Sequence, residues 1–176
     1  FDLLPTTRLG ASFNSGITLD THGHSSFFPP AGGELGTNEQ FTRGNLPARA
    51  QLSVQHDITS RWAAMGSVFY THWQVFKELT MTNTMTPMGF PISVTIPFNY
   101  SNCFDYAVGS SFKISDRLLL RAGLHFLGTP SNDIDRGVAD PIGSAKIVTA
   151  GVHYQQNETL SYDVGIGHTF FDRMPI

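Results

Sequence analysis

The sequence is poor in charged residues and in cysteine. Charged residues make up 14% of the 176-residue chain, well below the roughly 25% of ordinary globular proteins. Cys103 is the one cysteine, so no internal disulfide can form. The formal net charge of -3 provides no basic field for nucleic acid. No apolar run approaches the ~18 residues that a membrane-spanning helix requires. These absences exclude a disulfide framework, a basic nucleic-acid-binding domain and a helical membrane protein.

Glycine and phenylalanine, by contrast, are plentiful, with 17 and 14 copies. Two classes of β protein combine many apolar residues with few charges. One is a soluble β-sandwich with an aromatic core. The other is a membrane β-barrel, whose apolar outer face and polar inner face average to a near-neutral hydropathy. On composition alone we favour the sandwich, because soluble β proteins are the larger class.

Alternation of apolar and polar residues with a period of two is the main pattern of this sequence. Such alternation predicts strands with one apolar and one polar face. In residues 61–79 the facing is ambiguous, because aromatic residues occupy both sets of positions. The seven predicted strands cover residues 8–20, 48–58, 61–79, 104–114, 117–126, 146–154 and 160–170.

The connections between these strands alternate strictly between short and long. Three are tight polar turns, with the sequences DITSR, ISDR and QQNET. The other three are long and cover residues 21–45, 80–101 and 128–145. Short periplasmic turns and long outer loops are typical of an outer-membrane barrel. The connections therefore outweigh composition, and we predict an all-β, antiparallel up-and-down transmembrane β-barrel.

Four motifs in fixed order resemble the C-terminal half of the long-chain fatty acid outer-membrane transporters, the FadL/TodX/OMPP1-like family. The second motif includes Trp62, Trp73 and the Phe-Lys-Glu sequence at 76–78. The resemblance extends from about residue 5 to residue 170. It implies a 14-stranded barrel, of which these seven strands are roughly half. The motifs are TTRLGASF, LPARAQLSVQHDITSRWAAMGSVFYTHWQVFKEL, FDYAVGSSF and DRLLLRAGLHFLGTP.

The sequence also departs from the family pattern. The family has an Ile-Pro-Asp-x-Asp-Arg-like stretch where this chain has VADPIGSAKIV. The chain ends in FFDRMPI rather than in the terminal aromatic residue of a closing strand, and the family's N-terminal plug is absent. We therefore expect residues 1–176 to be a single-domain fragment of a barrel, without its plug and closing strand.

Arg121 lies in the middle of the otherwise apolar strand at residues 117–126. A charge there requires water or a partner, which a barrel lumen provides. Leu119 falls on the same predicted lumen face, where a polar residue is expected. The lumen-facing polar residues either brace the interior or shape a path for a substrate whose carboxylate is drawn by arginines. The predicted lumen-lining residues are Arg8, Arg49, Gln51, Asp105, Arg121, His125 and Asp163.

The predicted outer loops are unusually apolar. Exposed apolar loops often mark interaction sites, and methionine suits adaptable apolar sites. The loops either fold over the barrel mouth as a lid or form a docking site for an acyl chain or aromatic hydrocarbon. The candidate substrate-binding residues are Phe27, Phe28, Met81, Met85, Met88, Phe90 and Phe98.

No pattern in the sequence predicts a cofactor, a metal site or catalysis. His22 and His24 make only two possible ligands, and the sequence around Asp133 and Asp135 lacks a complete calcium loop. No nucleophile and base have convincing spacing. We therefore predict a protein that is not an enzyme.

The resemblance implies passive uptake of long-chain fatty acids or other hydrophobic compounds in the bacterial outer membrane. The expected partners are that substrate and the outer-membrane lipid and lipopolysaccharide, without nucleic acid. The full-length protein is expected to be a monomer. Two alternatives remain open: a structural or adhesive protein, in the outer membrane or as a β-sandwich, whose loops bind surface ligands, and a general porin.

Overall fold

Strands dominate the structure, a computed structural model that describes residues 2–131 and 143–172. The described residues form two antiparallel sheets and one three-residue 3-10 helix, η1 (Trp73–Val75). No helix in this part of the chain is long and apolar enough to cross a membrane. The main sheet contains, in chain order, β1 (Asp2–Leu4), β2 (Thr7–Asn14), β5 (Arg49–Asp57), β6 (Trp62–Thr71), β9 (Cys103–Ser115), β10 (Leu118–Leu127), β11 (Ala145–Gln155) and β12 (Ser161–Phe171). The outer sheet contains β3 (Ile17–Phe27), β4 (Leu35–Leu46), β7 (Glu78–Met85) and β8 (Pro91–Pro97).

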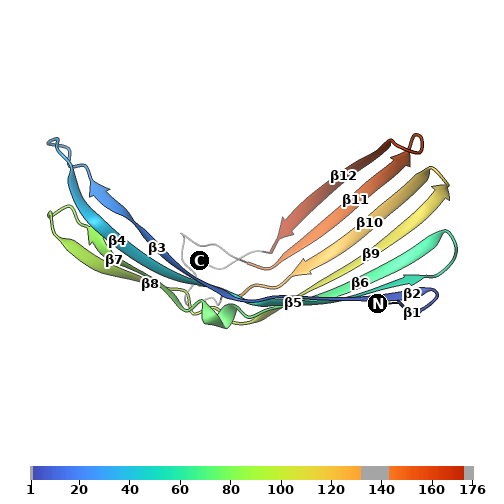
Figure 1. Cartoon of the computed structure of the whole chain (residues 1–176), viewed down its shortest axis with the longest axis horizontal. Coiled ribbons are helices and arrows are strands. Elements are labelled where there is room, and N and C mark those ends of the chain that lie inside the picture. The colour runs from blue at the N-terminus through green and yellow to red at the C-terminus, as the bar shows by residue number, and fades with distance from the viewer. Residues whose placement is uncertain (1, 132–142, 173–176) are drawn as a thin grey trace.

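The main sheet confirms the predicted up-and-down arrangement. Its seven long strands correspond to the seven predicted strands, and its strand order follows the chain, β1-β2-β5-β6-β9-β10-β11-β12. The short turns of the main sheet lie together at one end, at the right of Figure 1. The outer sheet continues from the opposite end, and the two sheets meet near η1 in an open V (Figure 1).

Strand pairing assigns each residue of the main sheet to a face, because cross-strand partners point to the same side. Leu124 pairs with Val108 on one neighbouring strand and Val148 on the other. The adjacent His125 pairs with Ala107 and Ile147 on the opposite face. The same register gives the outward face of β6, which the sequence left ambiguous. One apolar row crosses the sheet through Leu9, Val54, Gly66, Val108, Leu124 and Val148.

This apolar face has no protein core against it. The solvent-accessible area is 12256 Å², whereas a compact protein of 19.3 kDa exposes about 8,500 Å². Val164 and Ile166, in β12, are 72% and 77% exposed. A sandwich would bury such residues between its sheets. The continuous exposed band is instead the arrangement that a membrane barrel presents to lipid. The buried apolar residues in the described part are Ala63, Tyr100, Cys103 and Ala145.

The outer sheet corrects the prediction that residues 21–45 and 80–101 are loops. They contribute instead to two long hairpins, β3–β4 and β7–β8, which pair in the order β3-β4-β7-β8. The alternation of Thr and Met at 80–82 continues the strand that was predicted to end at residue 79, and β7 extends to Met85. Asn83 has a positive φ of 60°, and the β7–β8 register shifts beside it. The third predicted loop includes residues 132–142, which lie outside the described residues.

Two predicted strands divide where the sheets meet. Segment 8–20 separates into β2 and β3 at Gly16, where a Cβ atom would lie 2.9 Å from the carbonyl oxygen of Leu46. Only glycine allows the two chains to pass so closely. Segment 61–79 ends its main-sheet strand at Thr71 and then forms η1 before β7 begins. The close passage and the helical turn redirect the chain from one sheet to the other.

An aromatic cluster, defined as Trp73, Phe76, Phe98 and Tyr100, joins the two sheets. The Trp73 and Phe76 ring centroids lie 5.6 and 5.5 Å from that of Tyr100, which is 6% exposed. The backbone N–H of Phe98 donates to the carbonyl of Lys77 over 2.7 Å. The Trp-x-x-Phe-Lys sequence of the family motif therefore builds this junction.

The face assignment predicts a difference between two adjacent residues of β9. Val108→Lys places a charge on the outward face at mid-strand, which costs about 2–4 kcal/mol at the bilayer midplane. Ala107→Lys places the same charge on the opposite face, where water can solvate it, and should cost much less. Urea titration of the complete barrel in lipid vesicles measures both. Equal free energies of unfolding would contradict the assignment.

The exposed apolar face also predicts the behaviour of the isolated segment. Residues 1–176 expressed alone should aggregate in water, because the strands at the sheet edges are unpaired and the apolar face is uncovered. Size-exclusion chromatography and circular dichroism with and without detergent test this. A monodisperse chain that melts cooperatively in plain buffer would rule it out.

Candidate functional site

An exposed apolar tip forms where the two outer hairpins end. We define it as Phe28, Met88 and Phe90, which are 69%, 81% and 51% exposed. The two hairpin ends lie close together, because a Cβ atom added at Gly89 would be 3.8 Å from the Leu35 side chain. This tip is at the end of the molecule opposite the short turns (Figure 1). Three of the seven predicted substrate-binding residues therefore gather at the outermost point.

The other four predicted substrate-binding residues lie elsewhere. Phe27, Met81 and Met85 are half-buried within the outer sheet. The Met85 N–H donates to the Ser25 hydroxyl oxygen over 2.9 Å. Phe98 belongs to the aromatic cluster, with its ring centroid 5.0 Å from that of Phe76. The predicted substrate-binding residues thus lie in three places: at the apolar tip, within the outer sheet and in the aromatic cluster. The tip residues are exposed, whereas the other four are half-buried.

The outer sheet has a polar face as well. Asp20 and Arg43 are cross-strand partners, 2.6 Å apart, and the hydrogen bond from Arg43 lowers the pKa of Asp20. His22 packs edge-on against Phe41, with ring centroids 4.7 Å apart. No group of three potential metal ligands occurs among the described residues. Asp133 and Asp135, considered for calcium, lie outside them.

Each arginine predicted to line the lumen lies beside an aspartate on another strand of the main sheet. Nitrogen-to-oxygen distances are 3.7 Å for Arg8–Asp57, 3.7 Å for Arg49–Asp105 and 3.1 Å for Arg121–Asp163. Asp163 also contacts His153, whose Nδ1 is 3.0 Å away. Asp57 was missing from our site prediction, although it continues the polar positions of its strand. Arg8 and Asp57 thus link neighbouring strands, whereas the Arg49 and Arg121 pairs each reach across one intervening strand.

The most buried of these carboxylates is Asp105, which is 8% exposed. The Gly128 N–H donates to it over 3.0 Å. The Arg49 guanidinium lies 4.6 Å from the centroid of Phe69, whose other neighbour is the His125 ring at 5.6 Å. His125 Nε2 is buried and has no hydrogen-bond partner among the residues that the structure describes. Phe69 was missed because it occupies a polar position of its strand, and only the register shows that it faces the lumen.

Gln51, the remaining predicted lumen residue, has an uncharged hydrogen-bond partner. Its side-chain amide donates to the Ser53 hydroxyl over 2.9 Å, and this hydroxyl lies 2.8 Å from that of Ser67. Ser53 and Ser67 are cross-strand partners. Ser53 and Ser67 thus provide polar surface without charge on the lumen face of β5 and β6.

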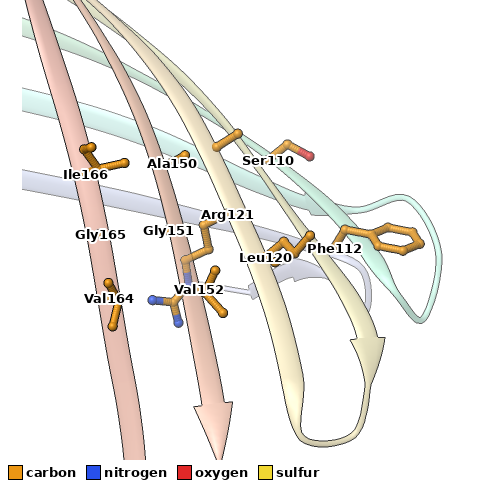
Figure 2. Close-up of a pocket in the computed structure, with 11 residues that line it drawn as sticks. Ser110, Phe112, Leu120, Arg121, Ala150, Gly151, Val152, Val164, Gly165 and Ile166 are labelled. Carbon is orange, nitrogen blue, oxygen red and sulfur yellow. The ribbon is translucent and has the colours of Figure 1, made fainter.

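Shallow hollows mark the outward face, where small residues stand among larger ones. One of about 400 Å³ lies around Ala122 and Ala150, between Leu120, Val152 and Val164 (Figure 2). A larger one of about 890 Å³ lies around Gly66 and is lined by residues of β2, β5, β6 and β9. Both hollows lie on the apolar outward face of the main sheet.

Comparison with known proteins agrees with this geometry. A family model described as outer membrane protein transport protein (OMPP1/FadL/TodX) matches residues 1–176. The long-chain fatty acid transport protein of Salmonella typhi is 24% identical over 96% of this chain. The 47 kDa outer membrane protein of Pasteurella multocida is 27% identical over 92% of it. The chain spans only 40% and 39% of the lengths of these relatives.

Solved structures share the fold. The crystal structure of a Pseudomonas aeruginosa FadL homologue superposes with a TM-score of 0.82 at 25% identity, over 96% of this chain and 42% of that one. The Pseudomonas putida toluene transporter TodX gives a TM-score of 0.65 at 21% identity, over 95% of this chain and 41% of that one. The open V of this chain is thus similar to part of a larger barrel.

The buried setting of Asp105 predicts a stability effect. Asp105→Ala leaves the Gly128 N–H and Arg49 without this acceptor, which should cost about 1–3 kcal/mol. Asp105→Asn keeps an acceptor oxygen and should cost less. Asp20→Ala, which breaks an exposed pair, is the control and should change stability little. Urea titration of the complete barrel measures all three, and an Asp105→Ala variant as stable as the control would refute the bracing role.

Proposed function

Because this chain belongs to the outer membrane protein transport protein family (OMPP1/FadL/TodX), we propose that it forms one wall of a barrel for the passive uptake of hydrophobic compounds. Membership places the chain in the bacterial outer membrane and among transport proteins rather than enzymes. The observation that carries the proposal is the apolar tip, because exposed apolar side chains at the outer end of a barrel provide a capture surface.

The main sheet does not close on itself, so a barrel requires further strands. The main sheet ends at β1 and at β12, and a barrel has no free edges within a membrane. We propose that further strands complete a barrel of about fourteen and that a plug fills its interior, as the family resemblance implies. The complete barrel is then a monomer whose outward face contacts outer-membrane lipid and lipopolysaccharide.

The substrate proposed is a long-chain fatty acid. Relatives carry the names long-chain fatty acid transport protein and toluene transporter, and both names describe apolar cargo. Met88 and Phe90 suit either cargo, since neither side chain recognises a head group. The compound binds at the tip, enters the barrel and leaves when the plug changes conformation. A general porin is disfavoured, because its outer loops would be less apolar and its constriction more strongly charged.

Removing the tip side chains should weaken substrate binding. In the complete barrel, Met88→Ser together with Phe90→Ser should reduce oleate affinity about five- to tenfold, because the ligand loses roughly 1–1.5 kcal/mol of apolar contact. Fluorescence titration of the detergent-solubilised protein measures the dissociation constant.

The matched control for this experiment removes two exposed apolar side chains from the opposite end. Leu4 and Ile58 are 57% and 42% exposed and lie in or beside the short turns. Leu4→Ser together with Ile58→Ser should leave oleate affinity unchanged. Oleate affinity that is the same in the tip variant and in the wild type would exclude the tip as the capture surface.

A further inference from the structure

One methionine differs from the others in its exposure. Met88, at the end of the β7–β8 hairpin, is 81% exposed. Met81 and Met85 are half-buried within β7, and Met65 is half-buried on the lumen face of β6. Met88 therefore carries the one exposed thioether among the residues that the structure describes. A thioether that solvent reaches is the kind that oxidants attack first.

A tight turn holds Met88 at the end of its hairpin. The Gly89 N–H donates to the Thr86 carbonyl over 3.0 Å. The hydroxyl and the N–H of Thr86 both donate to the Phe90 carbonyl, over 2.7 and 3.2 Å. Gly89 has a positive φ of 82°, which glycine adopts without strain. None of these hydrogen bonds involves Met88, so a change at its sulfur can alter the surface of the tip without opening the turn.

Oxidation of this thioether would change the chemistry of the apolar tip. A methionine sulfoxide is polar, whereas the thioether is apolar. Phe28 and Phe90, the other tip residues, have no sulfur that could react in this way. The oxidised tip keeps two apolar side chains and has a polar one at its most exposed position. An apolar compound loses contact area there, so its affinity for the tip falls.

We propose that Met88 is a modification site, at which a hydroperoxide oxidises the thioether to the sulfoxide and thereby lowers the affinity of the tip for apolar compounds. This inference rests on the proposed function, because it takes the tip as the surface that captures the substrate. The tip lies at the end of the molecule opposite the short turns (Figure 1). A hydroperoxide in the medium therefore reaches Met88 without entering the barrel.

The reaction needs only the thioether and the hydroperoxide. The sulfur lone pair attacks the terminal oxygen of the hydroperoxide, an S–O bond forms and the O–O bond breaks. The departing hydroxide or alkoxide takes the proton of the new S–OH group, which leaves the sulfoxide and one molecule of water or alcohol. The sulfur is oxidised and the peroxide is reduced by the same electron pair. Methionine sulfoxide reductases return the sulfoxide to the thioether, so the modification is reversible.

The test measures oxidation and binding on the same samples. The complete barrel in non-ionic detergent is treated with hydrogen peroxide, the peroxide is removed, and peptide mass spectrometry gives the oxidised fraction of each methionine. Met88 should be oxidised before the three half-buried methionines. Fluorescence titration should then show that oleate affinity has fallen about threefold. Treatment with methionine sulfoxide reductases should restore the affinity.

Three variants assign the effect to one sulfur atom. Met88→Leu has no thioether at this position, so its oleate affinity should be the same before and after peroxide. Met85→Leu is the matched control from the same hairpin, and peroxide should still lower its affinity about threefold. Met88→Gln places a polar side chain at the tip without any oxidant, and its oleate affinity should be below that of Met88→Leu.

The outcomes separate this inference from the proposed function. Oxidation of Met81 or Met85 as fast as that of Met88 would overturn the modification site, and so would an equal effect of peroxide on the Met88→Leu variant. Full oxidation of Met88 with unchanged oleate affinity would also overturn it. In each of these cases the proposed function stands if Met88→Ser with Phe90→Ser still weakens oleate binding. A barrel that binds no oleate before treatment would overturn the proposed function and this inference together.

Discussion

The pairing of neighbouring strands within one apolar-faced sheet is the constraint on which the rest of this structure depends. In a lipid environment no water is available to the backbone, so every N–H and C=O must be satisfied by an adjacent strand. The register that satisfies them also decides which side chains share a face. A slip of one residue would exchange Leu124 with His125 and send the polar residues into lipid. Backbone bonding and side-chain patterning therefore specify the same arrangement.

The ion pairs of the lumen face reinforce this register. Arg8, Arg49 and Arg121 each approach an aspartate on another strand, and the Arg49 and Arg121 pairs reach across an intervening strand. Most of these side chains remain accessible, so each pair contributes modestly to stability. Their larger effect is electrostatic, because each aspartate offsets the positive charge of the arginine beside it.

The outer sheet positions the proposed capture surface. It extends from the main sheet beyond the junction (Figure 1) and carries the apolar tip at its far end. The aromatic cluster holds the two sheets at their angle, with Tyr100 buried among its neighbours. The proposed capture surface thus lies at the end of the strands opposite the short turns (Figure 1).

The sequence alone was sufficient for the strands of the main sheet, for the faces of all its long strands except β6 and for the class of protein, because alternation with a period of two is a local property. It also placed Arg121 on the face of its strand opposite Leu120 and Leu124, as the register does. It was not sufficient for the hairpins at 17–46 and 78–97, where positive φ at Asn83 and tight glycine turns interrupt the alternation. Nor could it separate Phe98 from Met88, or show that each lumen arginine meets an aspartate. Those facts depend on contacts between strands distant in the chain, and only tertiary pairing decides which residues meet.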